Sequence, residues 1–325
     1  FFMRAIGNPY KNRIFATLCL RPKRHGKCKI SARLMKPTRK QIWTIAYPIL
    51  ISLLMENMIG LTDTAFLGRV GEVELGASAL GSVYYLVIFM LGFGFGIGAQ
   101  ILIARRNGEK AYALIGPLFQ QGLLFLLSLA TVMFVISHTF TPMVLRSLIS
   151  SDEVYEAAVS YTNWRVFGFF FAFVAIMFRA FFVGITNTKT LTLNSIVMVL
   201  SNVVLNYVLV FGKLGLPAMG IAGAAIASSA SEMISMVFFI VYTRLRIDHR
   251  KYGLFRFAGF SSKLLRGMLN VSVWTMIQMF VAIFSFSSRS SIWASGRWPS
   301  RTSSAACRAS SSSSSARSPQ RPARS

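Results

Sequence analysis

The sequence predicts an all-α integral membrane protein, and three observations lead to that prediction. Hydrophobic residues make up 54% of the 325 residues and charged residues only 14%, whereas soluble domains are about one-quarter charged. The hydrophobic residues gather in runs of about 20, the length that a helix needs to cross a bilayer. Within these runs they are continuous rather than alternating, which favours helices over the strands of a membrane barrel.

Seven segments have this character, and the loops between them are short apart from 139–160 and 243–268. The first contains Pro48, which removes a backbone hydrogen bond and is expected to kink the helix. The second carries overlapping GxxxG pairs between Gly92 and Gly98, which favour close helix packing. The fourth is rich in phenylalanine and is expected to face lipid, with an apolar drug cavity as the alternative. The sixth is built of small residues, and the seventh is the weakest. The expected spans are 42–67, 75–104, 111–138, 161–185, 191–212, 219–242 and 269–286.

The formal net charge of +25 comes mostly from the two ends of the chain. Residues 1–40 hold 12 Lys and Arg, and residues 285–325 hold 7 Arg, with no acidic residue in either segment. The middle keeps 16 basic and 10 acidic residues, so no nucleic-acid surface is expected there. The cysteines lie in the two ends without CxxC spacing, which argues against a disulfide framework or a zinc site.

The loop charges predict a cytoplasmic N-terminus. In that orientation the inner loops hold 11 basic residues, and the outer loops hold 3 basic and 5 acidic residues. Basic residues are retained on the cytoplasmic side of membrane proteins. The chain is therefore expected to be a multi-pass protein with its N-terminus inside.

The two ends do not read as folded domains. Residues 1–34 lack helical periodicity, and a natural start is expected at Met35. The segment before it is expected to be upstream translated sequence, or else a disordered basic arm on anionic lipid. After Phe284 a Ser- and Arg-rich tail replaces the span, which indicates a frameshift or truncation, with an RNA-binding tail as the alternative. The expected plan is a basic extension (1–40), a six-span bundle (41–244), a basic cytoplasmic linker (245–268), a partial seventh span (269–284) and the tail (285–325).

Polar residues inside the spans are the candidate functional residues, because a charge near the bilayer centre is costly. Glu56 and Asp63 are seven residues apart and share one face of the first helix. Asn202 and Asn206 share a face of the fifth helix, and Ser228 lies about 13 Å below the outer end of the sixth. Asp63, the two amides and the hydroxyl are therefore expected to meet in one cavity that exchanges a proton or a cation. For Asp63 the alternative is a helix-end residue near the outer interface, and for the amides it is interhelical hydrogen bonding alone. For Glu56 the alternative is pairing with a donor on a neighbouring helix.

The sequence carries no motif for catalysis or for direct use of ATP. The second-span glycines do not satisfy GxGxxG, and there is no Walker A sequence and no HExxH. No nucleophile–base set or metal set appears in the sequence. The protein is therefore not expected to be an enzyme, and no catalytic residue, metal site or organic cofactor is predicted.

Two stretches resemble the MATE (multidrug and toxic compound extrusion) family. YPILISLLMENMIGLTDTAFLGRVGEVELGASALG is similar to that family's first span, and GITNTKTLTLNSIVMVLSNVVLNYVLVFGKLGLPAMGIAGAAIAS to its fourth-to-sixth span region. The resemblance, over residues 41 to about 284, implies the six-helix N-lobe and a partial seventh helix of a twelve-span inner-membrane antiporter. Such a protein exports cationic or amphipathic drugs in exchange for H⁺ or Na⁺. The missing C-lobe would be needed, because alternating access uses both walls.

The resemblance also assigns site residues. The family's first-span acid falls on Asp63 and its kink proline on Pro48. The fifth-span asparagine falls on Asn202 and the sixth-span hydroxyl on Ser228. The position four residues after Asn202, often Asp in proton-coupled members, is Asn206 here.

A secondary polar site is expected at Glu56 and Gln278. Gln278 matches the seventh-span glutamine of some sodium-coupled members, while Glu56 has no assigned counterpart. Two alternatives to the antiporter stay open. One is a non-transporting membrane fragment or anchor, which salt-dependent RNA binding by residues 285–325 would favour. The other is a flippase for lipid-linked sugars, whose cavity would need more cationic residues than Arg165 and Arg179.

Overall fold

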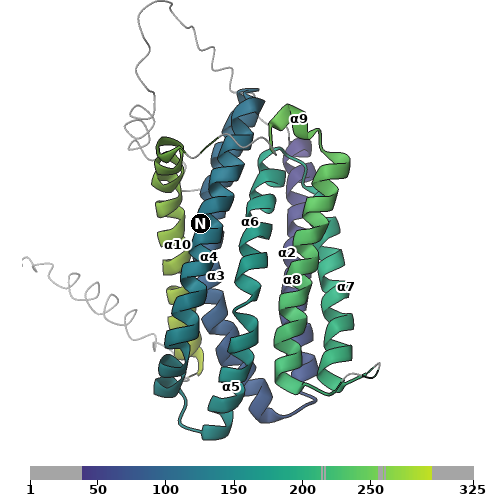
Figure 1. Ribbon diagram of the computed structural model, residues 1–325, viewed down its shortest axis with the longest axis vertical. Coiled ribbons are helices and arrows are strands. Elements are labelled where there is room, and N and C mark those ends of the chain that lie inside the picture. Colours follow the sequence, from purple (N-terminus) through teal and green to yellow (C-terminus); the bar gives the residue numbers. More distant parts are fainter. Residues whose placement is uncertain (1–38, 214, 216, 255–258, 260, 295–325) are drawn as a thin grey trace, which may run out of the picture. The chain divides into compact units, whose positions relative to one another are not determined.

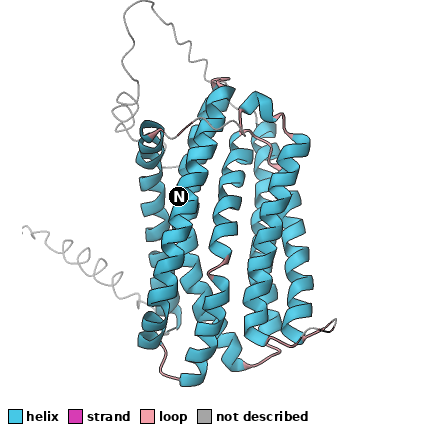
Figure 2. Cartoon of the chain, in the orientation of Figure 1, coloured by secondary structure: helices cyan, strands magenta, loops and turns pink. Residues whose placement is uncertain are grey.

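The computed structural model describes residues 39–213, 215, 217–254, 259 and 261–294. The expected basic extension up to residue 38, with Met35, and the tail beyond Ala294 lie outside these residues. The chain divides into a unit of residues 1–42 and a unit of residues 43–325, and the packing below is that of the second. All regular elements of the described residues are helical (Figures 1 and 2). They are α2 (Arg39–Leu67), α3 (Glu72–Gly108), η2 (Tyr112–Leu114), α4 (Ile115–Leu148), α5 (Asp152–Arg165), α6 (Gly168–Gly184), α7 (Lys189–Phe211), α8 (Gly220–Arg246), α9 (His249–Tyr252) and α10 (Ser262–Ala294).

Five of these helices are long and apolar enough to cross a membrane: α2, α3, α4, α7 and α8. Helices α5 and α6 provide a sixth span if they are counted as one, bent by 48° at the break between them. The predicted fold class, an all-helical membrane protein, is confirmed. The described part of α10 is not among the apolar spans, in agreement with the weak run expected at 269–286.

The prediction of a long loop over residues 139–160 is wrong. Helix α4 continues to Leu148, and α5 begins at Asp152 after three residues. The 34 residues of α4 extend about 51 Å at 1.5 Å per residue, well beyond the roughly 30 Å of bilayer hydrocarbon. Hydropathy therefore detects only the part of the helix that is apolar. Helices also occupy parts of the expected linker 245–268, because α8 ends at Arg246 and α10 begins at Ser262.

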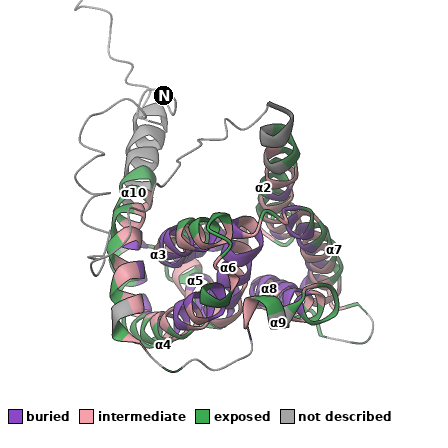
Figure 3. Ribbon diagram, turned by 90° about the horizontal axis from the view of Figure 1, so that it is seen from above, coloured by how far each residue is buried: buried purple, intermediate pink, exposed green. Residues whose placement is uncertain are grey.

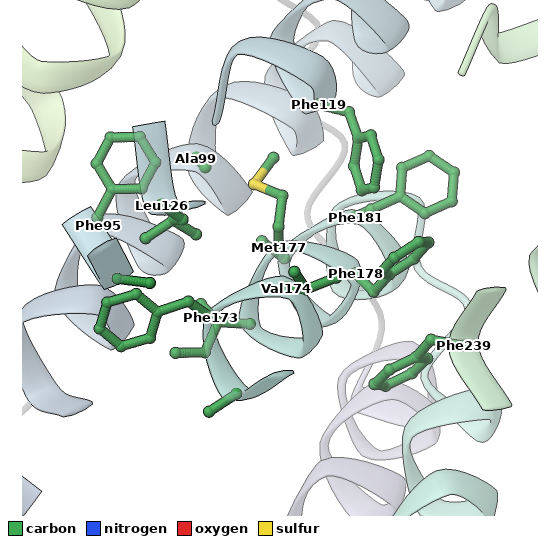
Figure 4. Packing of buried hydrophobic residues seen from close by; sticks show 14 of the residues in the cluster. Phe95, Ala99, Phe119, Leu126, Phe173, Val174, Met177, Phe178, Phe181 and Phe239 are labelled. Atoms are coloured by element: carbon green, nitrogen blue, oxygen red, sulfur yellow. The ribbon is translucent and has the colours of Figure 1, made fainter. Parts of the chain in front are cut away.

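Helix α6 forms the centre of the hydrophobic core, so the expectation that its phenylalanines face lipid is wrong. It packs against α3, α4 and α8. Phe169, Phe173, Phe181 and Phe182 have no exposed surface, and Figure 4 shows Phe173 and Phe181 among the side chains of this core. A helix that is hydrophobic on all sides is typical of a buried position, and neighbouring helices cover this one.

Helix α2 differs from the other spans because very few of its side chains are buried (Figure 3). Leu54 and Leu61 keep more than 60% of their surface exposed. Polar contacts attach the helix to the bundle at Pro48, Glu56 and Asp63. These positions are eight and seven residues apart, which places them on one face at intervals of about two turns. Two of these three polar contacts involve an acidic side chain of α2.

The glycines of α3 bring this helix close to α10, as their spacing predicts. Thr275 Oγ1 donates to the carbonyl of Gly94 at 2.7 Å, and Ser272 Oγ donates to the carbonyl of Phe95 at 3.3 Å. A Cβ placed on Gly94 would lie 2.7 Å from the Cα of Met276. The lack of a side chain thus allows the two backbones to approach.

Candidate functional site

The carboxylate of Asp63 on α2 lies among polar groups from α7 and α8. Asn206 Nδ2 donates to Asp63 Oδ1 at 2.6 Å, and Asn202 Nδ2 donates to the same oxygen at 3.2 Å. Ser228 Oγ donates to Asp63 Oδ2 at 2.7 Å. The structure therefore brings together the four side chains that the sequence placed in one cavity, and all three donors to the carboxylate are neutral.

The helices position these donors through ordinary helical spacing. Asn202 and Asn206 are four residues apart on α7, so both amides point to α2, and Asn206 also donates to Asn202 Oδ1 at 3.1 Å. Both side chains are fully buried. Asn206 Oδ1 accepts no hydrogen bond among the described residues, although it is shielded from solvent. One buried acceptor next to Asp63 thus remains available.

Two cavities meet at Asp63. The larger has a volume of about 570 Å³, and its walls include Phe89 and Phe93 of α3 and Met198 of α7. The smaller, of about 450 Å³, lies toward α3 and is lined by Ser78 and other residues of α2, α3 and α5. Asp63 lines both. A group on this wall is reachable from either side, while the larger cavity has the mostly apolar lining typical of a small-molecule site.

A buried ion pair in the larger cavity was missed by the sequence reasoning. Arg165 Nη2 lies 2.6 Å from Glu232 Oε1, and Nη1 lies 3.1 Å from Oε2. The Tyr85 hydroxyl donates to both carboxylate oxygens at 3.0 and 2.9 Å, and its ring centroid lies 3.6 Å from Arg165 Cζ. The signal was present in the sequence, because Glu232 is an acid within the sixth span, four residues after Ser228 on the same helical face.

Glu56 pairs with Arg179 of α6, whose Nη1 lies 2.5 Å from Glu56 Oε1. This contact corresponds to the alternative expected for Glu56, a donor on a neighbouring helix. Both side chains line the larger cavity, and they keep 33% and 19% of their surface exposed. Glu56 thus lines the same cavity as Asp63. It is the middle one of the three positions at which polar contacts attach α2 to the bundle.

We expect the Glu56–Arg179 pair to contribute about 1 kcal/mol to stability, because partial exposure places it between surface pairs and buried ones. A double-mutant cycle of Glu56→Gln and Arg179→Gln, followed by thermal unfolding in detergent, measures this coupling. The exposed pair of Arg105 and Glu109 is the matched control, with an expected coupling below about 0.5 kcal/mol. Equal couplings for the two pairs would contradict a role for the cavity in strengthening the first.

The remaining predicted residues lie apart from the Asp63 cluster. Gln278 is exposed on α10 and does not line the larger cavity with Glu56. Helix α2 continues through Pro48, whose carbonyl accepts a hydrogen bond from Thr192 Oγ1 of α7 at 2.9 Å. No group of three or more His, Cys, Asp or Glu side chains within the described ranges could hold a metal ion.

Comparison with known proteins finds a family model that matches part of this chain. The family model named MatE matches residues 48–208, which include Asp63, Asn202 and Asn206. Residues 48–208 belong to the MatE family. The match covers α2 to most of α7, so it contains the carboxylate and both amides of the site.

The curated relatives that match this chain carry the name "Probable multidrug resistance protein NorM". The one from Mannheimia succiniciproducens is 26% identical over 217 residues, which are 66% of this chain and 46% of the relative. The one from Synechocystis sp. is 29% identical over 223 residues, which are 68% of this chain and 48% of the relative. The chain thus spans about half the length of the curated relatives it matches.

Solved structures show the same fold. The eukaryotic MATE transporter AtDTX14 has a TM-score of 0.68 and 22% identity, over 80% of this chain and 56% of that one. An outward-facing multidrug resistance MATE family transporter has a TM-score of 0.65 and 22% identity, over 75% of this chain and 54% of that one. At these identities the likeness concerns the fold of the MatE bundle and not its substrate.

Proposed function

We propose that this chain is one half of a secondary active multidrug efflux antiporter in which Asp63 exchanges a proton or a sodium ion. The observation that carries this proposal is a carboxylate held by neutral donors on a wall shared by two cavities. Ionisable groups inside a membrane bundle commonly mark ion pathways. The names of the NorM relatives support drug export as the transported reaction.

The shell of Asp63 is suited to both charge states of the carboxyl group. A hydroxyl such as that of Ser228 is able to donate or accept, and an amide offers both a donor and an acceptor. When Asp63 takes up a proton, it becomes a donor and its charge-assisted bonds weaken. The free Asn206 Oδ1 is then an acceptor that amide rotation brings to it. Because Asp63 is one attachment point of α2, the change biases how this helix is held.

The larger cavity is the proposed substrate site. Its aromatic walls, with Phe89 and Phe93 on α3, suit flat apolar compounds, and aromatic faces also attract cations. Glu56 and Asp63 add carboxylates on one side of this cavity. An amphipathic compound with a cationic group is therefore the substrate class that the lining favours.

We also propose that the bundle lies in the plasma membrane with its N-terminus in the cytoplasm. The charges of the loops favour this orientation. Alternating access requires a second lobe to form the opposite wall of the substrate cavity. Because the chain spans about half the length of its relatives, a partner lobe is the appropriate addition in a test of transport.

The test is ethidium export from bacteria that lack their own efflux pumps. The chain is expressed alone and together with the second half of the Synechocystis relative. We expect the combination to lower ethidium accumulation, and an imposed proton or sodium gradient in proteoliposomes to drive the export. Export that is independent of both gradients, or equal to that of the second half alone, would contradict the proposal.

A further inference from the structure

Arg165 is a fixed positive charge near Asp63 that does not bond to it. Arg165 and Asp63 line the same cavity, yet the hydrogen bonds to Asp63 within the described residues come from two amides and one hydroxyl. A guanidinium paired with a carboxylate holds it in the ionised form. A direct Arg165–Asp63 pair would therefore oppose the exchange proposed above.

The Arg165 guanidinium pairs with the carboxylate of Glu232 instead. Both terminal nitrogens of Arg165 bond to the Glu232 carboxylate at 2.6 and 3.1 Å. The Tyr85 ring covers one face of the guanidinium, and its hydroxyl donates to both oxygens of Glu232. The Arg165 and Glu232 side chains keep only 11% and 9% of their surface exposed. Arg165 is thus held by charge, by stacking and by burial at once.

The absence of a side chain at Gly168 makes room for this pair. Gly168 is the first residue of α6, directly after the break. A Cβ on Gly168 would lie 2.5 Å from Arg165 Nη1 and 2.5 Å from Glu232 Oε2. Ser229 Oγ also donates to the carbonyl of Trp164 at 3.3 Å, which ties α8 to the end of α5. The local backbone is therefore shaped around the pair.

Other charges near Asp63 are already paired or neutral in the described structure. Glu56 is paired with Arg179, and Tyr161 bonds to Ser82 at 3.2 Å. Helix α7 presents amides to Asp63. The titratable and charged side chains that share the larger cavity with Asp63 are Glu56 of α2, Tyr85 of α3, Tyr161 and Arg165 of α5, Arg179 of α6 and Glu232 of α8.

We propose that Glu232 is a positioning residue for the coupling site: it holds the Arg165 guanidinium in a bidentate pair and so keeps Asp63 free to exchange its ion. This inference rests on the proposed function and adds a residue that acts through another. Glu232 lies four residues after Ser228, so one face of α8 carries both a donor to Asp63 and the anion that retains Arg165. The role of Glu232 is electrostatic, so each change of charge at Glu232 or Arg165 should shift the titration midpoint of Asp63 in a defined direction.

The test is an infrared pH titration of the purified 325-residue chain in lipid nanodiscs. The band of the protonated Asp63 carboxyl group is the part of the carboxylic C=O signal that Asp63→Asn removes. Glu232→Gln leaves Arg165 without its anion, and we expect the Asp63 midpoint to move to lower pH by roughly one unit. Arg165→Gln leaves Glu232 without its cation, and the midpoint should move to higher pH. The double variant should return close to the parent value.

The controls separate this role from a merely structural one. Glu153→Gln removes an exposed carboxyl group at the start of α5 and should leave the midpoint unchanged. If one single variant fails to fold, the other single variant and the double variant still show in which direction the Asp63 midpoint shifts. Equal midpoints in all folded variants, or shifts of the same sign in both single variants, would overturn the inference alone. A parent chain without any band that depends on Asp63 would overturn the proposed function, and the inference with it.

Discussion

Asp63→Asn should reduce ethidium export by the combined halves to the level of cells without a transporter. The amide has nearly the shape of the carboxyl group, but it does not exchange a proton at physiological pH and does not neutralise a bound cation. Three neutral donors converge on the carboxylate at 2.6, 2.7 and 3.2 Å. Hydrogen bonds to a charged group contribute about 1.5–3 kcal/mol and those to a neutral group about 1 kcal/mol. The variant therefore also loses the change in bonding that we propose to bias how α2 is held.

Two measurements test this prediction. The first is the minimum inhibitory concentration of ethidium, and the second is the amount of the chain in the membrane fraction. Membrane abundance should be preserved, because the substitution removes a costly charge from the bundle. Glu153→Gln is the control for removal of a carboxyl group and should keep full resistance. Resistance near the parent level in Asp63→Asn would refute the assignment of the coupling site.

Gly223→Ala should destabilise the bundle and disturb the site, although it adds one methyl group on another helix. A Cβ at Gly223 of α8 would lie 2.6 Å from the carbonyl oxygen of Leu209 and 3.1 Å from the nitrogen of Val210, both on α7. These are backbone atoms, so relief requires the two helices to separate. Overpacking of this kind costs about 1–3 kcal/mol.

The effect reaches the site because Leu209 follows Asn206 by three residues, about 4.5 Å along α7. Separation of α7 from α8 moves Asn206 away from Ser228, and these two side chains now donate to Asp63 at 2.6 and 2.7 Å. We expect a lower midpoint of thermal unfolding in detergent and reduced ethidium export. Gly76→Ala on α3 is the matched control, since nothing lies within 4 Å of a Cβ there. Its stability should equal or exceed that of the parent, because alanine favours helices by up to about 1 kcal/mol. Equal stability of the two variants would contradict the predicted contact.

The sequence determined the membrane class and most of the helices by itself. Continuous apolar runs of about 20 residues leave few structures other than helices in lipid, because backbone groups must be satisfied within the segment. Helical spacing also placed Asn202 with Asn206, since residues four apart share a face whatever surrounds the helix. The acid Asp63 was detectable because a charge in an apolar run is costly and therefore uncommon.

Other features required tertiary structure because they depend on which helices are neighbours. The phenylalanines of α6 are as apolar as lipid-facing side chains, and their burial became visible only when α3, α4 and α8 were seen around them. The break between α5 and α6 falls inside the single span expected at 161–185, and only the structure shows that one helix ends and another begins there. The pairing of Arg165 with Glu232 joins positions 67 residues apart. A charge in the sequence shows that a partner is needed, but only the packing of α5 against α8 decides which charge is close enough to be that partner.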